Sequence, residues 1–293
     1  MELWGRVGSM TAPIEVLPGI YPDMSNDDYH YGPGVSKSGL DWIAKCPALY
    51  RAKYITRELK DKETAAKAVG KATHLAVFQP EIFATEVAVA PEINRRTNAG
   101  KEEYAAFLHE SAGKTIITQA EHDQVRYIAD SVRRHPIAAN VLKEGQAETS
   151  IFSTDQKTGE LVKVRPDWMH QELLVDLKSI LNASPDYFSR EMWNRRYYVQ
   201  SPFYLDVANQ EYGGRFSNFL FICAEKEPPF LVEVYLIDQA SIQAGRDEYR
   251  RCLDIYHECK TSGKWPCYNG GKIKEIGLPV WALNQIGGAS YVE

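Results

Sequence analysis

The chain has 293 residues, of which 44% are hydrophobic and 25% charged, so it is long and apolar enough to bury a substantial core. Its 34 Lys and Arg against 39 Asp and Glu give a net charge of −5, which excludes a uniformly basic exterior. We see no signal peptide and no apolar run that would span a bilayer, and with five Cys we expect a reduced, cytoplasmic protein with no membrane contact.

Periodicity predicts an α/β or α+β fold. Helices are expected at residues 36–46, 64–78, 100–111, 119–133, 186–210 and 240–261, and strands at 148–154, 160–167, 172–178, 217–224 and 230–237. This order predicts a mixed central sheet flanked by helices, with a helical N-terminal addition. No Gly/Ser- or Pro-rich linker divides the chain, so we expect a single domain over residues 19–293 after an extension, residues 1–18, that carries no function.

The first candidate functional residue, His74, lies in the Ala-rich helix predicted before Pro80. We expect Gly70 to let another element pack closely one turn before His74. A lone His on such a helix is more often a core or surface residue than a ligand. The helix alone therefore leaves the role of His74 open.

The most informative stretch is residues 164–178. Asp167 ends one predicted strand, and Asp176 and Lys178 lie on the next. Side chains two residues apart in a strand share a face, so Asp176 and Lys178 point together while Leu177 points away. Asp167 then approaches Asp176 across a hairpin, and two carboxylates beside an amine suit a hard divalent cation and phosphodiester chemistry. Alternatively, Asp167 caps a turn and the other two form an exposed strand end, because Asp-x-Lys is a short pattern.

Gln200 and Tyr204 are four residues apart in the long helix predicted after this hairpin, so they share one helix face. Pro202 lies between them. It removes a backbone donor and collides with the preceding turn, so we expect the helix to kink near Tyr198 or to start afresh close to Ser201.

Taken together, these motifs resemble the PD-(D/E)XK nucleases of the RecB-like branch. They are Gly70 with His74, Arg165-Pro166-Asp167, Asp176 with Lys178, and Gln200 with Tyr204. Within that branch the chain is similar to the RecE (exonuclease VIII) nuclease domains over residues 19–281. This similarity also rests on residues 24–30, 35–38, 47–50, 94–101, 265–266 and 278–281.

The resemblance implies a PD-(D/E)XK core that resects double-stranded DNA ends in the 5′ to 3′ direction and leaves 3′ single strands for recombination. It further implies Mg²⁺ as cofactor, a ring-shaped homotetramer, a RecT-like single-strand annealing protein as partner, and the cytoplasm of a bacterial or phage-infected cell. Two alternatives stay open: a related nuclease with other polarity or endonuclease activity, and a non-catalytic DNA-binding protein of the same fold.

Site roles follow from the resemblance residue by residue. Asp167, Asp176 and the Leu177 carbonyl match the metal ligands, His74 the metal-associated histidine, Lys178 the catalytic lysine, and Gln200 and Tyr204 the supporting helix motif. Because imidazole suits Mn²⁺ better than Mg²⁺, we expect Mn²⁺ to substitute. Glu148, at the start of the predicted strand 148–154, either reaches the site or is solvated.

Basic residues form local clusters that could meet DNA in a channel in spite of the net negative charge. The candidates are Arg95, Arg96, Arg165, Arg195 and Arg196. Each pair alone is more typical of a solvated face. We favour residues 95–98 as a phosphate-contacting loop because they are polar and precede the helix that begins near Gly100.

Some RecB-like nucleases hold a [4Fe–4S] cluster, and four cysteines here imitate that layout: Cys46, Cys252, Cys259 and Cys267. The last three are more widely spaced than in compact cluster motifs. Cys252 and Cys259 are also two turns apart on a predicted helix, which fits core packing equally well. We therefore expect no iron-sulfur cluster.

Overall fold

The centre of the fold is a five-stranded mixed sheet. A computed structural model describes residues 16–60 and 64–286, so most of the predicted N-terminal extension lies outside the described residues. The sheet order is β10-β9-β8-β7-β4, with β8 and β9 parallel and the other neighbours antiparallel. Its strands are β4 (Gln146–Ala147), β7 (Trp168–His170), β8 (Leu173–Ile180), β9 (Asn218–Glu225) and β10 (Val232–Leu236).

Side chains alternate along the two parallel strands and enter two separate cores. Leu174 and Phe221 point into one core, while Val175 and Ile222 point into the other. A sheet that is apolar on both faces must be covered on both. The predicted mixed α/β class is therefore confirmed, and its two cores share one sheet.

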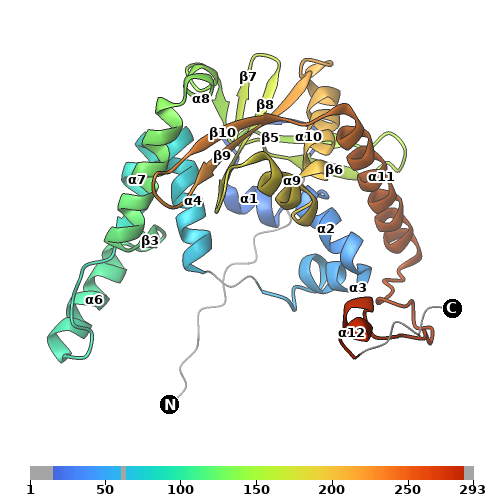
Figure 1. Ribbon diagram of the computed structural model, residues 1–293, viewed down its shortest axis with the longest axis horizontal. Helices are drawn as coiled ribbons and strands as arrows, with labels where there is room; N and C mark the ends of the chain where they lie inside the picture. The colour runs from blue at the N-terminus through green and yellow to red at the C-terminus, as the bar shows by residue number, and fades with distance from the viewer. Residues whose placement is uncertain (1–15, 61–63, 287–293) are drawn as a thin grey trace.

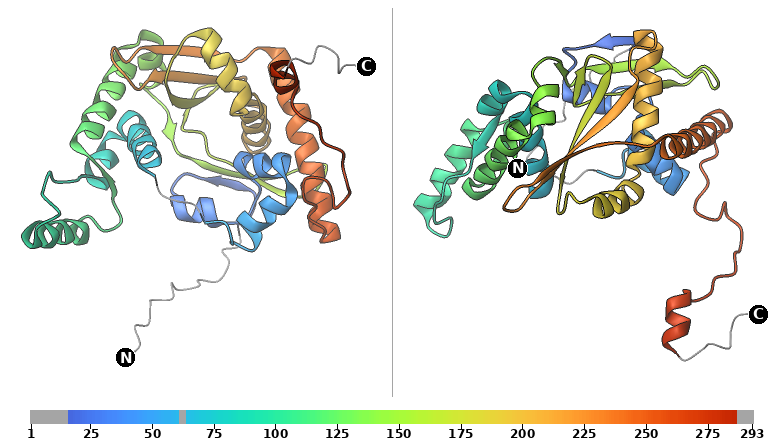
Figure 2. Two further views of the ribbon diagram at one scale, coloured as in Figure 1. Left: turned by 60° about the horizontal axis from the view of Figure 1, so that its bottom comes forward. Right: turned by 45° about the horizontal axis from the view of Figure 1, so that its top comes forward.

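Helices cover both faces, as Figure 1 shows. On one face lie α4 (Ala65–Phe78), α7 (Gln119–Arg134) and α8 (Pro136–Val141), and on the other α2 (Lys37–Lys45), α9 (Pro185–Asn194), α10 (Tyr197–Tyr212) and α11 (Gln239–Ser262). The segment after α11 leads away from the body to α12 (Val280–Gln285), most clearly in the right-hand view of Figure 2. Among the described residues, every helix is too short or too polar to cross a membrane.

The remaining elements pack around both faces of the large sheet. They are β1 (Gly19–Tyr21), α1 (Asn26–Tyr31), α3 (Pro47–Tyr50), the π-helical turn η1 (Arg51–Ile55), α5 (Pro80–Glu86), β2 (Val87–Val89), α6 (Asn98–Glu110), β3 (Thr115–Ile117), β5 (Ser150–Thr154) and β6 (Leu161–Val164). Strands β1, β5 and β6 form a three-stranded antiparallel sheet, and β2 pairs with β3.

Two strand bounds differ from the expectation. The predicted strand 160–167 ends at Val164, so Asp167 directly precedes β7 instead of ending β6. The predicted strand 148–154 begins at Ser150, because the chain leaves the large sheet after β4 and enters the small one at β5. Glu148 stands at this crossover with φ of 50°.

The predicted helix 186–210 is two helices. Arg196 adopts a left-handed conformation, φ 56°, which ends α9 and lets α10 restart at Tyr197, so the expected restart near Ser201 is corrected. Ion pairs hold this junction: the Arg196 guanidinium donates to Asp41 of α2 and Glu248 of α11, both at 2.8 Å. Lys37 of α2 donates to the Arg195 carbonyl at 2.9 Å.

Pro202 is accommodated inside α10 through contact with α11. Its ring nitrogen cannot bond the carbonyl four residues earlier, that of Tyr198. Gly245 of α11 lies against this oxygen, and a Cβ added there would approach it to 1.8 Å. The absent side chain at Gly245 therefore permits the close crossing of α10 and α11. Gly70, by contrast, meets nothing within 4 Å among the described residues, so the close packing we expected there is wrong.

We expect Gly245→Ala to destabilise the protein by about 1–3 kcal/mol, because the added methyl group collides with backbone that cannot move without shifting α10. Gly70→Ala is the matched control on an open helix face and should stabilise by about 0.5–1 kcal/mol. Urea unfolding of both variants measures the difference. Equal free energies of unfolding would contradict the crossing geometry.

The junction also predicts a pH dependence of stability. Hydrogen bonds from Arg251 and then Arg196 lower the pKa of Glu248 to about 2, from the usual 4.5. A carboxylate with a depressed pKa stabilises the fold above its unfolded pKa and loses that contribution as the pH falls toward its folded pKa. Glu248→Gln should therefore lower Tm at pH 7, and the gap to wild type should shrink between pH 4.5 and 2. Scanning calorimetry at both ends of that window checks this, and a constant gap would refute it.

Candidate active site

The site lies where β7 begins and leaves the edge of β8 uncovered. Trp168 pairs with Val175, so β8 residues beyond Val175 have no β7 backbone opposite them. The Leu177 N–H, which has no strand partner, donates instead to the Asp167 carboxylate, Oδ2, at 2.7 Å. In an antiparallel ladder the N–H and C=O of one residue face the same neighbour, so the Leu177 carbonyl lies on the Asp167 side as well. The hairpin thus brings Asp167 beside Asp176, as predicted.

Asp176 and Lys178 share the α10 face of β8 and are held by Gln200. The Lys178 ammonium lies 2.6 Å from Asp176 Oδ2 and donates to Gln200 Oε1 at 3.0 Å. The Gln200 amide nitrogen donates in turn to the other Asp176 oxygen. Gln200 therefore fixes both charged groups at once, because its amide offers one acceptor and two donors.

Aromatic rings complete the surroundings of the lysine. The Lys178 ammonium lies 4.2 Å from the ring centre of Tyr197, a contact that sequence patterns did not single out. Tyr204, one turn beyond Gln200, packs edge-on against Phe219. Burial, with the nearby Tyr29 and Asp176, raises the pKa of Tyr204 well above its usual value, so the phenol stays neutral.

A second group of ligand atoms stands beside this pair. One ligand atom each from His74, Glu148 and Asp167 lies within 4.8 Å of the other two. His74 Nδ1 approaches Asp167 Oδ2 to 3.3 Å, and the Glu148 N–H donates to the Asp167 carbonyl at 3.2 Å. Glu148 thus reaches the site, which the strand pattern left open. Only the left-handed turn between the two sheets aims it there, and no sequence signal marks that turn.

Electrostatics separate the two aspartates. Burial raises the pKa of Asp167, but His74 and Lys178 outweigh it and hold the pKa below its usual range. Burial and the Asp167 charge instead raise the pKa of Asp176. Burial lowers the pKa of His74, yet Asp167 reverses this and raises it to about 9, while burial and Asp167 raise that of Glu148 to about 7. Crowded carboxylates of this kind favour a bound cation.

The donor set fits a divalent cation. Two carboxylates and an imidazole are the ligands of Mg²⁺ or Mn²⁺, and Oδ2 of Asp176 is a buried oxygen that accepts no well-aligned hydrogen bond, although the Lys178 ammonium lies nearby. Among residues 16–60 and 64–286, the group of three metal-ligating side chains is His74, Glu148 and Asp167. None of its members is a cysteine. Cys46, Cys252 and Cys259 are buried, and Cys267 is exposed.

The five arginines proposed for DNA contact fall into two sets. Arg165 donates to Ser150, Asn26 and the Met24 carbonyl and is buried, and Arg196 is held by Asp41 and Glu248. Their internal partners favour structural roles for these two. The exposed set is Arg95, Arg96 and Arg195. Arg195 pairs with Glu191 at 2.9 Å, and the Arg95 guanidinium lies 4.5 Å from the ring centre of Tyr104. Their contact with DNA stays a prediction.

Comparison with known proteins shows the family to which the chain belongs. Residues 36–276 match a family model described as a PDDEXK-like domain of unknown function (DUF3799), so the chain belongs to this family. One similar solved structure is a protein of Eubacterium rectale described as a putative exonuclease, with 15% identity and a TM-score of 0.58, covering 91% of this chain and 97% of that one. At this identity the likeness shows the fold alone. A search of the curated proteins finds no match. The PD-(D/E)XK class expected from the four motifs is thereby confirmed.

Removing one carboxylate of the site should weaken metal binding without unfolding the protein. We expect Asp167→Asn and Glu148→Gln each to lower Mn²⁺ affinity about tenfold or more, because each removes a charged ligand. Titration calorimetry of purified protein measures this. Glu144→Gln, at an exposed carboxylate just before β4, is the control. Unchanged affinity in both ligand variants would show that the cluster does not bind metal.

Proposed function

We propose that the protein is a Mg²⁺-dependent exodeoxyribonuclease that resects double-stranded DNA ends. The observation that carries the proposal is the juxtaposition of His74, Glu148 and Asp167 with the held pair Asp176 and Lys178. The fold and the family support a nuclease. The substrate, the 5′ to 3′ polarity and the role in recombination rest on the RecE-like motifs.

A divalent cation, when bound, would lower the pKa of a water molecule and neutralise charge on the scissile phosphate. Asp167, Glu148 and His74 would hold it, with the Leu177 carbonyl on the same side. Mn²⁺ is expected to substitute for Mg²⁺, since imidazole is one of the donors.

The buried ammonium of Lys178 is the group that would stabilise negative charge developing on the phosphate oxygens. Its position is preorganised, since Asp176, Gln200 and the Tyr197 ring hold it before substrate arrives. Gln200 acts through these two charged groups, and Tyr204, one turn further along α10, packs against Phe219 as a neutral phenol. The chain therefore supplies orientation and fixed charge, and needs no further general base of its own.

Two alternatives share the same site. An endonuclease or an exonuclease of other polarity would use identical hydrolytic chemistry and differ only in how the strand is presented. A non-catalytic DNA-binding protein is disfavoured, because buried carboxylates with opposed pKa shifts are costly to retain without a reaction to serve.

The proposed partners also rest on the resemblance. We propose a ring-shaped homotetramer acting beside a RecT-like annealing protein, in the cytoplasm of a bacterial or phage-infected cell. A ring would keep a chain of net charge −5 on DNA by enclosing the duplex rather than by bulk charge.

Cleavage should require both members of the held pair. We expect Asp176→Ala and Lys178→Ala each to lower kcat by about 10²-fold or more, because transition-state charge loses its fixed partners. The assay follows linear duplex labelled separately at the 5′ and 3′ ends, with closed circular plasmid, in Mg²⁺ or EDTA.

Circular dichroism of the variants controls for folding. Mg²⁺-dependent loss of 5′ label from linear DNA alone supports the proposal. Nicking of the circle would favour the endonuclease, and full activity in either variant would overturn the site assignment.

The loop before α6 should contribute affinity rather than chemistry. It is preformed: the Arg96 N–H donates to Asn94 Oδ1 at 3.1 Å, and Gly100 lies against the Asn94 carbonyl. We expect Arg95→Ala with Arg96→Ala to weaken duplex binding and flatten its salt dependence, because two phosphate contacts are lost. Fluorescence anisotropy over a salt series tests this. An unchanged slope would remove the loop from the DNA interface.

A further inference from the structure

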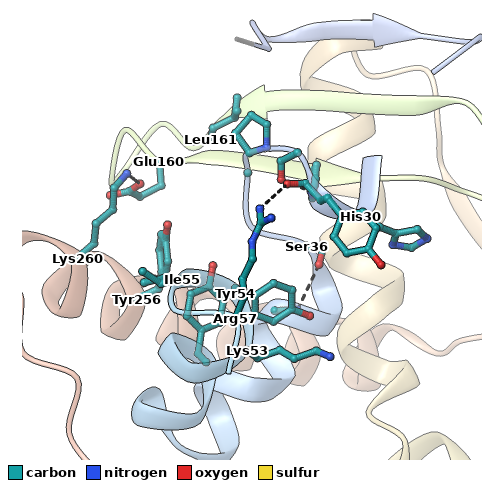
Figure 3. A pocket seen from close by; sticks show the side chains of 17 residues that line it. His30, Ser36, Lys53, Tyr54, Ile55, Arg57, Glu160, Leu161, Tyr256 and Lys260 are labelled. Atoms are coloured by element: carbon teal, nitrogen blue, oxygen red, sulfur yellow. Dashed lines mark hydrogen bonds and ion pairs between the residues drawn. The ribbon is translucent and has the colours of Figure 1, made fainter. Parts of the chain in front are cut away.

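A second cavity, of about 320 Å³, lies at the C-terminal end of α1. The end of α1 with residues 32–34 after it, η1, the start of β6 and the end of α11 line it, and Figure 3 shows side chains from these elements around it. The cavity beside His74 and Glu148 is a different one, lined by the start of α1 instead. The two cavities thus meet opposite ends of α1.

The cavity is basic although the chain as a whole is acidic. Its lining holds Lys53, Arg57, Lys163 and Lys260 against one carboxylate, that of Glu160. Glu160 is already engaged, with Lys260 at 2.5 Å and His257 at 2.9 Å. Arg57 and Lys163 are paired with no described carboxylate, so they leave positive charge in excess on this wall, which favours an anionic ligand.

Lys163 contributes charge from within the fold. Its ammonium donates to the carbonyls of Tyr29 and Gly32, which end α1, and no described carboxylate lies within ion-pair distance of it. Burial and then Arg165 lower its pKa to about 8. Its charge has no anionic partner among the described residues, so its field reaches the adjoining cavity.

Arg57 stands at the mouth. It is exposed, and its backbone is left-handed, with φ of 57°. Its guanidinium lies 3.5 Å from the Tyr31 carbonyl and has no ion pair with a described carboxylate. Figure 3 shows it reaching across the cavity past Tyr54. A guanidinium held by one weak contact keeps donors for a phosphate, which it can bind in bidentate fashion.

Aromatic rings add an apolar surface to the charged groups of the cavity. Tyr50 is stacked between Tyr54, at 4.9 Å, and Trp265, at 5.6 Å, and Tyr256 meets it edge-on. This stack fixes a tyrosine wall on the cavity, while the ring of Tyr31 at the mouth is 67% exposed. Tyr31 is therefore the ring that offers a base a face, and bases stack on such rings with little sequence preference.

We propose that this cavity binds a free nucleoside monophosphate, with the phosphate at Arg57 and the base against the tyrosines. Its volume lies at the lower end of the range for small-molecule sites, about 300–1,000 Å³, which suits one nucleotide rather than a strand. The inference rests on the proposed function only for where the ligand comes from. An exonuclease that hydrolyses DNA ends one residue at a time releases nucleoside monophosphates.

The test is titration calorimetry of full-length Asp176→Ala protein in EDTA, so that neither cleavage nor metal-bound phosphate contributes. We expect deoxyadenosine monophosphate to bind at one site per chain, and deoxyadenosine or inorganic phosphate alone to bind about tenfold more weakly or less. Arg57→Ala should lower the affinity about tenfold or more. Arg215→Ala is the matched control, because that guanidinium also donates to a backbone carbonyl, of Gln171, but lies outside the cavity.

Four results would overturn the proposal: no saturable binding, equal binding of phosphate alone, equal loss in both arginine variants, or tighter Arg57-dependent binding of a 5′-phosphorylated oligonucleotide than of the mononucleotide. Tyr31→Ala, at an exposed ring, gives a second variant that cannot fail through unfolding of the core and should also weaken binding. Because no step requires hydrolysis, failure of cleavage by wild-type protein would leave this result interpretable on its own.

Discussion

One carboxylate oxygen holds the catalytic region together. Oδ2 of Asp167 accepts the Leu177 N–H, which the short strand β7 leaves unpaired, and faces the His74 imidazole of α4. An unsatisfied N–H in the middle of the sheet would be costly, so the same contact that stabilises the end of the hairpin also fixes an oxygen of the proposed metal site. Fold and site thus share one interaction, and a substitution that keeps an acceptor oxygen, such as Asp167→Asn, removes the charge while leaving an acceptor for the Leu177 N–H.

The two aspartates of the hairpin then become chemically different because their neighbours differ. Asp167 faces His74 and a backbone donor, which favour its ionised form, whereas Asp176 is more deeply buried and feels the Asp167 charge. Lys178 and Gln200 offset the cost of keeping Asp176 charged. The two carboxylates therefore differ in their partners: Asp167 faces an imidazole and a backbone donor, and Asp176 is bound to the lysine.

Elements distant from the site position Gln200. It lies in the first turns of α10, and α10 begins where Lys37 and Asp41 of α2, with Glu248 of α11, hold the junction at Arg196. The N-terminal helical addition therefore belongs to the same mechanical unit as the sheet. Helix α1 of this addition lines the cavity beside His74 and Glu148 with its start and the second, basic cavity with its end.

Local patterns were enough to determine much of this protein. Strand alternation predicted that Asp176 and Lys178 share a face, and helical spacing predicted that Gln200 and Tyr204 share another, because both depend only on backbone periodicity. The tertiary structure alone decided the rest. The left-handed turn that aims Glu148, the restart of α10 at Tyr197, and the burial of Arg165 against α1 all arise from contacts between segments far apart in the chain. Such contacts leave no periodic signal in the sequence, since each depends on where another element happens to pack.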